Sequence, residues 1–287
     1  MRWQGRRKSE NVEFRSSSGT GKKVGLGSVA TIIVALLIWW MTGDPSQVLQ
    51  LVSEGGGPAA TDQPAISSAK DQKTADFLSV VLADTEDIWN QIFKEHGMSY
   101  RMPSMVFFRD AVRSACGQAS AQVGPFYCAG DERVYIDISF MDKLQNHVGA
   151  QGDFVQAYIV AHEVGHHVQK LTGILQKVND LRGTISEVEI NDLTVRLELQ
   201  ADFYAGVWAH YVDKYKNVLD EGDIDEAINA ARVIGDDILQ KRAQGYVVPD
   251  SFTHGTSAQR VRWFKLGYET GDFSRGDTFS ADSASDL

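Results

Sequence analysis

A glutamate between two histidines is the grouping in this chain whose residue types and spacing best fit hydrolytic chemistry. His162, Glu163 and His166 form the pattern His-Glu-x-x-His, next to an apolar run, residues 154–161, without charge or proline. That run is long enough for a buried helix, on which positions i and i+4 share a face. His162 and His166 can therefore bind one zinc ion, and Glu163 can act as a general base on a water molecule there. The competing interpretation is a pair of core histidines, because the pattern also occurs by chance.

A carboxylate in a second long helix can supply the third protein ligand. Glu198 and Asp202 are four residues apart within a helix predicted over about residues 193–215, so they also share a face. Glu198 completes a His₂Glu site with one position open for water, and Asp202 accepts a hydrogen bond from a ligand imidazole. The alternative is a helix whose charges face solvent. It fits poorly, because large apolar residues surround these carboxylates and a buried carboxylate needs a metal or another partner.

Composition limits the class of partner. The chain has 287 residues and a formal net charge of −10, which suits one globular domain with appendages. Residues 1–23 hold seven Lys/Arg and two Glu, a net charge of +5, so the remainder carries −15. An acidic main domain argues against nucleic acid as a partner, because phosphate binding needs a basic face.

The basic residues 1–23 precede a candidate membrane anchor. Residues 24–42 contain no ionisable side chain and end near Trp39 and Trp40, which is typical of a transmembrane helix with aromatic residues at the interface. Positive charge before the span places the N-terminus in the cytoplasm. We therefore expect a single-pass protein of the cytoplasmic membrane with a periplasmic domain. A cleaved signal peptide is the competing interpretation, but residues 41–43 make a poor cleavage site.

The composition after the anchor changes twice. A flexible linker, a folded domain and a disordered tail are predicted over residues 43–74, 75–272 and 273–287. Apolar spacing predicts an amphipathic helix over residues 75–95, and short strands are predicted at residues 105–108 and 134–140. The predicted fold class is a mostly helical α+β domain with a small β-sheet, behind one N-terminal transmembrane helix.

The two cysteines of the chain, Cys116 and Cys128, flank a loop rich in glycine, serine and alanine. Outside the cytoplasm an even number of cysteines favours a disulfide. Two alternatives stay open. The cysteines could be buried free thiols, or Cys128 could be a zinc ligand of the kind found in deformylases, which share the His-Glu-x-x-His pattern.

Segments along nearly the whole chain carry a resemblance to one family. They are residues 1–7, 11–13, 43–47, 124–128, 162–169, 198–208 and 252–264. These segments are similar to the neutral zinc metallopeptidase family of membrane-anchored bacterial proteins. The resemblance implies a gluzincin-like fold with His162, His166 and Glu198 as zinc ligands and Glu163 as the base.

The same resemblance predicts where substrate binds. In zincins an extended peptide pairs with an edge strand by main-chain hydrogen bonds. The strand at residues 134–140 is therefore the expected edge strand, with Tyr135, Asp137 and Ser139 on one of its faces. His167 is not expected to be a ligand, because position i+1 points about 100° away from the metal face.

A second resemblance concerns His254 and Arg260. Thr253-His254-Gly255 before a helix with Arg260 is similar to the His-Pro…Arg segment of CAAX-type gluzincins, with Gly255 in place of the proline. It implies that His254 stabilises the oxyanion, and that Arg260 orients the substrate carbonyl or braces the site. In the structural alternative, His254 caps backbone groups and Arg260 pairs with a surface carboxylate.

The sequence therefore predicts a membrane-anchored, Zn²⁺-dependent endopeptidase that hydrolyses peptides or proteins outside the cytoplasm. A non-catalytic zinc-binding scaffold is disfavoured, because all three ligands and Glu163 are retained. A zinc amidase that acts on cell-wall peptide stays open.

Overall fold

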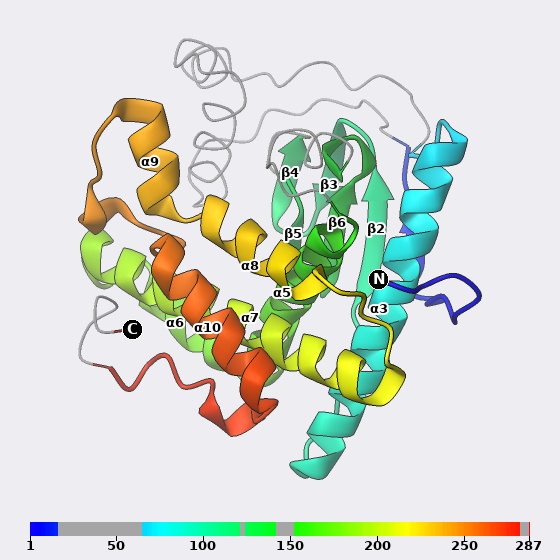
Figure 1. The fold of residues 1–287 in the computed structure, drawn as a ribbon. Helices are drawn as coiled ribbons and strands as arrows, with labels where there is room; N and C mark the ends of the chain where they lie inside the picture. Colours follow the sequence, from blue (N-terminus) through cyan, green and yellow to red (C-terminus); the bar gives the residue numbers. More distant parts are fainter. Residues whose placement is uncertain (17–64, 121–123, 142–151, 282–286) are drawn as a thin grey trace.

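A four-stranded sheet packs against the helices that make up most of the structure (Figure 1). The computed structural model describes residues 1–16, 65–120, 124–141, 152–281 and 287. The strand order is β1-β2-β6-β5, in which β5 runs antiparallel to β6 and the other pairs are parallel. These strands are β1 (Val12–Phe14), β2 (Ser104–Phe108), β5 (Phe126–Cys128) and β6 (Arg133–Asp137). A hairpin of β3 (Ala111–Ser114) and β4 (Gly117–Ser120) lies beside this sheet.

The two faces of the sheet are covered differently because side chains alternate along each strand. Met105 and Phe107 of β2 and Ile136 of β6 face the helical core. Val106 of β2 and Tyr135 of β6 pack on the other face, where the β3–β4 hairpin covers them. The predicted strand at residues 105–108 is confirmed.

Helices form most of the rest of the described chain, as the mostly helical α+β prediction required. They are α3 (Ala69–Glu95), α5 (Phe154–Leu171), α6 (Ile174–Leu181), α7 (Glu187–Lys216), α8 (Asp223–Val233), α9 (Asp236–Gln244) and α10 (Ser257–Thr270). The helix predicted from residue 75 begins six residues earlier, because the side chain of Ser68 caps the backbone N–H of Asp71. The second long helix also begins earlier than predicted, at a capping box formed by Ser186 and Glu189.

Small residues let α5, α7 and α10 pack at very short distances. A Cβ atom on Gly165 of α5 would lie 3.0 Å from Cα of Ala201 in α7. Gly206 of α7 and Gly267 of α10 face each other's helix even more closely, since a Cβ on either would lie 2.1 Å from a backbone oxygen of the other helix. These contacts bring α5, α7 and α10 together around one buried cluster of polar side chains.

The N-terminal segment belongs to this folded unit. β1 pairs with β2, and Arg6 and Arg7 reach Asp84 (2.5 Å) and Glu86 (3.0 Å) of α3, two acids that are only 2% and 1% exposed. Buried carboxylates need such partners. The described part of the predicted basic segment, residues 1–16, is therefore packed on the main domain, and two of its arginines compensate buried acids.

This pairing restricts how the chain can be arranged at a membrane. Residues 1–16 and the chain from residue 65 onward contribute to one sheet, so they lie on the same side of any membrane. A cytoplasmic N-terminus with a periplasmic domain is incompatible with that pairing. Among the described residues no helix is long and apolar enough to span a membrane. The predicted anchor, residues 24–42, lies outside the described residues.

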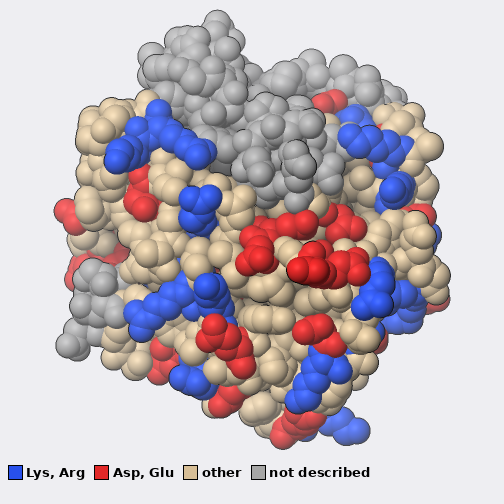
Figure 2. All heavy atoms as spheres, viewed as in Figure 1, with Lys and Arg blue, Asp and Glu red and all other residues tan. Residues whose placement is uncertain are grey.

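An acidic cluster lies where α8 begins. Figure 2 shows a group of acidic side chains near the centre of this face, surrounded by mixed charges. The first turn of α8 contains Asp223, Asp225 and Glu226. The ammonium group of Met1 lies 3.1 Å from Asp223 and 3.0 Å from Asp153. This ammonium group therefore supplies a positive charge to the cluster.

The C-terminal segment is ordered further than predicted. Arg196 donates to the carbonyl oxygens of Thr278 (3.0 Å) and Ala281 (2.9 Å), and Thr278 is buried. The prediction of a disordered tail over residues 273–287 is wrong for residues 273–281, because α7 supplies side-chain donors to their backbone.

The predicted edge strand is an interior strand. β6 pairs with β2 on one side and β5 on the other, so its main-chain groups are used within the sheet. The strand also ends at Asp137, whose carboxylate accepts the backbone N–H groups of Ser139 (2.7 Å) and Phe140 (3.3 Å). A helical segment therefore begins after Asp137, with Ser139 in its first turn, and Tyr135 packs under the hairpin. The assignment of residues 134–140 as the substrate edge is wrong.

Candidate metal centre

Three side chains from α5 and α7 converge as a possible ligand set. One ligand atom of each of His162, His166 and Glu198 lies within 4.8 Å of the other two. The Nε2 atoms of His162 and His166 lie 3.2 and 3.4 Å from the carboxylate oxygens of Glu198. Two imidazoles and one carboxylate are a donor set that zinc accepts. The residues predicted from sequence as ligands are thus brought together by the fold.

Hydrogen bonds direct Nε2 of His162 toward this centre. Its Nδ1 lies 2.9 Å from Oδ1 of Asp202, an acceptor, so Nδ1 carries a proton and Nε2 is the atom that can offer a lone pair to a cation. Asp202 also accepts from Arg260 Nε (2.7 Å) and from the Tyr158 hydroxyl (2.5 Å). Arg260 is buried and contacts Asp202 rather than an open space. This arrangement matches the bracing role that was one of its two predicted roles.

His166 is oriented by a residue that the sequence analysis did not single out. Its Nδ1 lies 2.9 Å from Oε1 of Gln169. The Gln169 amide nitrogen donates to the carbonyl of Leu197 (2.7 Å) and to Oε1 of Gln200 (3.1 Å), so Oε1 is the atom that faces His166. The i+3 spacing of Gln169 from His166 on a helix was the available signal. The lone pair of His166 Nε2 therefore also points toward Glu198.

The electrostatics of the centre favour a cation. Burial opposes a charge on His162, but hydrogen bonds and charge from Asp202 and Glu198 raise its pKa to about 10. Burial also opposes ionisation of Glu198 and Asp202, yet the neighbouring histidines hold the pKa of Glu198 below its ordinary value, and Arg260 with His162 lowers that of Asp202 to about 2. Two ionised carboxylates around two imidazoles fit a divalent cation.

Glu163 lies beside the ligand set on α5. Burial raises the pKa of its carboxyl above the ordinary value, against the charges of His166 and His162. The backbone N–H of Tyr127 in β5 donates a hydrogen bond to this carboxylate. A buried carboxyl with a raised pKa is the type of group that can take up and return a proton.

His254 is held by an aspartate that the sequence analysis missed. Its Nδ1 lies 3.1 Å from Oδ1 of Asp236, and the other oxygen of Asp236 accepts the backbone N–H of His254 at 2.6 Å. Burial opposes protonation, but Asp236 raises the pKa of His254. The charge of His254 is one of those that lower the pKa of Glu198, so the two side chains are electrostatic neighbours.

The other predicted residues have structural contacts. Cys116 and Cys128 form a disulfide, which confirms that prediction and removes both alternatives. His167 is buried with both ring nitrogens bonded to protein atoms, and burial lowers its pKa. His167 is therefore not a ligand.

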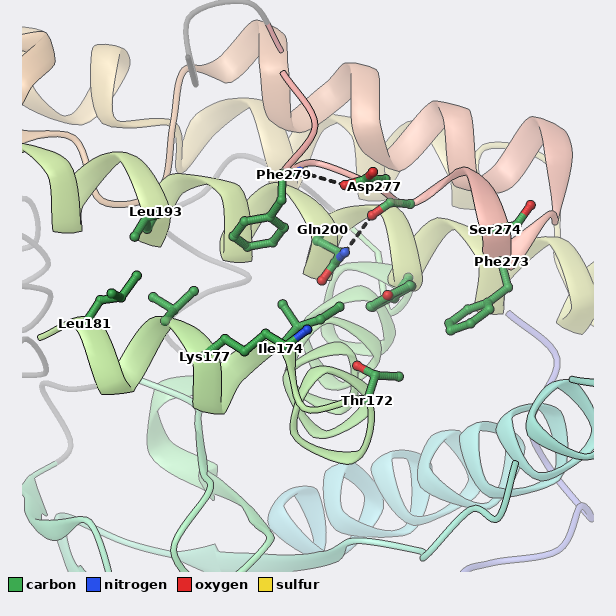
Figure 3. A pocket seen from close by; sticks show the side chains of 13 residues that line it. Thr172, Ile174, Lys177, Leu181, Leu193, Gln200, Phe273, Ser274, Asp277 and Phe279 are labelled. Atoms are coloured by element: carbon green, nitrogen blue, oxygen red, sulfur yellow. Dashed lines mark hydrogen bonds between the residues drawn. The ribbon is translucent and has the colours of Figure 1, made fainter. Parts of the chain in front are cut away.

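A cavity of about 530 Å³ lies apart from the ligand set, between α6, α7 and residues 273–279. Figure 3 shows Gln200 at its wall, where the Gln200 amide donates to the carbonyl oxygen of Gly276 at 2.6 Å. Gln200 also accepts from Gln169. The cavity is thus separated from His166 by two side-chain amides, and His162, His166 and Glu198 do not line it.

Comparisons with known proteins identify the family of the chain. The family model described as "Putative neutral zinc metallopeptidase" matches residues 1–279. "Uncharacterized protein YpfJ" of Escherichia coli K12 is 46% identical over 289 residues, covering 97% of this chain and 99% of that protein. "Uncharacterized protein Rv2575" of Mycobacterium tuberculosis H37Rv is 39% identical over 216 residues, covering 71% and 72%. No solved structure matches. The chain belongs to the family described as "Putative neutral zinc metallopeptidase".

Proposed function

We propose that the chain is a zinc-dependent endopeptidase with His162, His166 and Glu198 as its metal ligands. The observation that carries this proposal is the convergence of their ligand atoms within 4.8 Å, with Glu163 beside them on α5. The donor set fits zinc, and hydrogen bonds to Asp202 and Gln169 turn the Nε2 atoms inward. Membership of the family supports the same assignment.

The chemistry divides between the metal and Glu163. Zinc held by His162, His166 and Glu198 would supply a Lewis acid that polarises the scissile carbonyl and acidifies water. Glu163 takes a proton from the attacking water and returns it to the leaving amine. The raised pKa of Glu163, caused by burial, suits a group that holds this proton between the two steps.

His254 is proposed to stabilise the oxyanion. Asp236 binds its Nδ1, while Nε2 has no hydrogen-bond partner among the described residues. The raised pKa of His254 favours a protonated imidazole, which can donate to developing negative charge. Its electrostatic effect on Glu198 supports a position near the metal ligands.

Substrate is proposed to lie along β5, in place of the strand predicted from sequence. Among the described strands, β5 pairs only with β6, so the main-chain groups on its other edge, apart from the Tyr127 N–H that donates to Glu163, can meet an extended peptide. The Tyr127 N–H contacts Glu163, which brings this edge next to the proposed base.

We also propose that the folded unit, residues 1–16 included, works outside the cytoplasm. The Cys116–Cys128 disulfide supports an oxidising compartment. Lys8→Cys and Lys241→Cys place single thiols on exposed positions of the two parts. In spheroplasts with an intact cytoplasmic membrane, a membrane-impermeant thiol reagent should label both thiols. Protection of both would place the unit in the cytoplasm, and labelling of one alone would contradict the β1–β2 pairing.

The activity is tested by incubating unfolded proteins and cell-wall peptides with the zinc-loaded chain and with Glu163→Gln. Mass spectrometry should find new internal cleavage sites in the proteins with the wild type alone. Cleavage of cell-wall peptide without protein cleavage would favour the amidase. No cleavage of either class would favour the scaffold.

A further inference from the structure

His167, next to the proposed ligand His166, uses both ring nitrogens in hydrogen bonds. Nε2 lies 2.6 Å from the carbonyl oxygen of Arg101, and Nδ1 lies 2.8 Å from the hydroxyl of Tyr127. A carbonyl oxygen only accepts, so Nε2 carries the proton and Nδ1 accepts the Tyr127 O–H. The His167 residue is 0% exposed. The network therefore determines both the tautomer of His167 and the position of the Tyr127 side chain.

Tyr127 also contacts the proposed base, through its main chain. Its backbone N–H donates to the carboxylate of Glu163. Glu163 and His167 are four residues apart on α5, so they lie on the same face of that helix. One residue of β5 is thus joined to α5 at two points, by its hydroxyl and by its backbone.

The next residue ties β5 to a different part of the fold. Cys128 is bonded to Cys116, which lies between β3 and β4. A Cβ atom added to Gly130 would lie 3.1 Å from Cβ of Ala115, so the chain also packs closely just after β5. With β6 on one side, the hairpin below and α5 above, the main chain of Tyr127 has little freedom to move.

We propose that His167 and Tyr127 are positioning residues for Glu163. By holding β5 against α5, they keep the Tyr127 N–H on the Glu163 carboxylate and so limit its orientations. A general base must lie within hydrogen-bond reach of the water it deprotonates, and a small displacement reduces turnover strongly. This inference rests on the proposed peptidase function and adds the group that orients its base.

The chain offers a matched set of variants. Tyr127→Phe removes the hydroxyl and retains the ring and backbone N–H. His167→Phe removes both ring nitrogens. Tyr100→Phe is the control, because the Tyr100 ring packs against His167 with centroids 5.6 Å apart while its buried hydroxyl has no hydrogen-bond partner among the described residues.

We expect Tyr127→Phe to lower kcat about 10-fold, with KM and zinc content unchanged, since one hydrogen bond is removed from the support of the base. His167→Phe should lower kcat at least as much, and the double variant should be no slower than His167→Phe, because both act through one contact. Tyr100→Phe should retain the wild-type kcat. A wild-type kcat in Tyr127→Phe, a change in KM alone, or an equal loss in Tyr100→Phe would overturn the inference.

Failure of the proposed function gives a different pattern, because the wild type itself would then cleave no peptide. Amide hydrogen exchange tests the inference in that case. Exchange in a fragment containing residues 126–128 should be about 10-fold faster in Tyr127→Phe than in the wild type or Tyr100→Phe, since β5 is released from α5. Identical exchange in all three proteins would overturn the positioning role.

Discussion

Arg260 of α10 binds Asp202 of α7 through two hydrogen bonds, from Nε to Oδ2 at 2.7 Å and from Nη2 to Oδ1 at 2.9 Å. Both side chains are almost fully buried, at 2% and 0% exposure. The guanidinium keeps Asp202 ionised, and Asp202 in turn holds Nδ1 of His162. α10 thus orients His162, a proposed metal ligand about a hundred residues earlier in the chain.

Replacing Asp202 tests this support. Asp202→Asn retains an acceptor but loses the charge that Arg260 and His162 contact, so the imidazole of His162 is less well oriented. We expect zinc affinity to fall about 10- to 100-fold, measured by competition with a chelator. Glu187→Ala, at an exposed carboxylate in the first turn of α7, is the control. An unchanged zinc affinity in Asp202→Asn would show that Asp202 does not support the proposed metal site.

His254→Ala separates its two predicted roles. If His254 stabilises the oxyanion, kcat should fall about 10²-fold while zinc content and Tm stay as in the wild type. Peptide cleavage, metal analysis and thermal unfolding are measured on the same preparation. A lower Tm with an unchanged kcat would leave His254 with a structural role only.

Asp236 links stability to acid pH. Burial would raise its pKa, but the charge and hydrogen bond of His254, with the backbone N–H groups of Thr253 and His254, lower it. Because the pKa is lower in the folded state, the ionised carboxylate stabilises the fold at pH values above the unfolded pKa of about 4. This stabilisation is lost as the pH falls through the folded pKa. Asp236→Asn should therefore lower the free energy of unfolding at pH 7 by about 2 kcal/mol, measured by denaturant titration. The difference from the wild type should shrink below about pH 4. A difference that is independent of pH would contradict this role.

The N-terminal arginines are predicted to stabilise the domain. Arg6→Ala leaves the buried carboxylate of Asp84 with Lys216 as its remaining cationic partner. We expect the free energy of unfolding to fall by about 1–3 kcal/mol. Lys8→Ala is the control, because Lys8 and Asp76 form an ion pair that is 50% and 30% exposed, and such pairs contribute about 0–1 kcal/mol. Equal effects of both variants would argue against docking of residues 1–16.

Local periodicity explains what could be predicted from the sequence. His162 and His166, like Glu198 and Asp202, follow the four-residue spacing of a helix, which depends on short stretches of chain. Pairing of these helices also followed from local cues, since Gly165 and the small residues of α7 allow close approach. The ligand set therefore needed no knowledge of the wider fold.

The sheet could not be predicted in the same way. Period-two alternation identified strands but not their neighbours, and β1 pairs with β2 across about ninety residues of sequence. The choice of β5 as the edge strand depends on that strand order. Asp236 and Tyr127 were missed for a related reason, because each contacts a residue that only the folded chain brings near. Gln169 was missed although its i+3 spacing from His166 was visible in the sequence.

Zinc content tests the central claim most directly. The purified wild type and Glu163→Gln should each contain about one zinc ion per chain by elemental analysis, because Glu163 is not a ligand. Glu163→Gln should at the same time show no peptide cleavage, since it lacks the base. The His162→Ala/His166→Ala double variant, tested under the same conditions, should contain almost none. Undiminished zinc in the double variant would contradict the account.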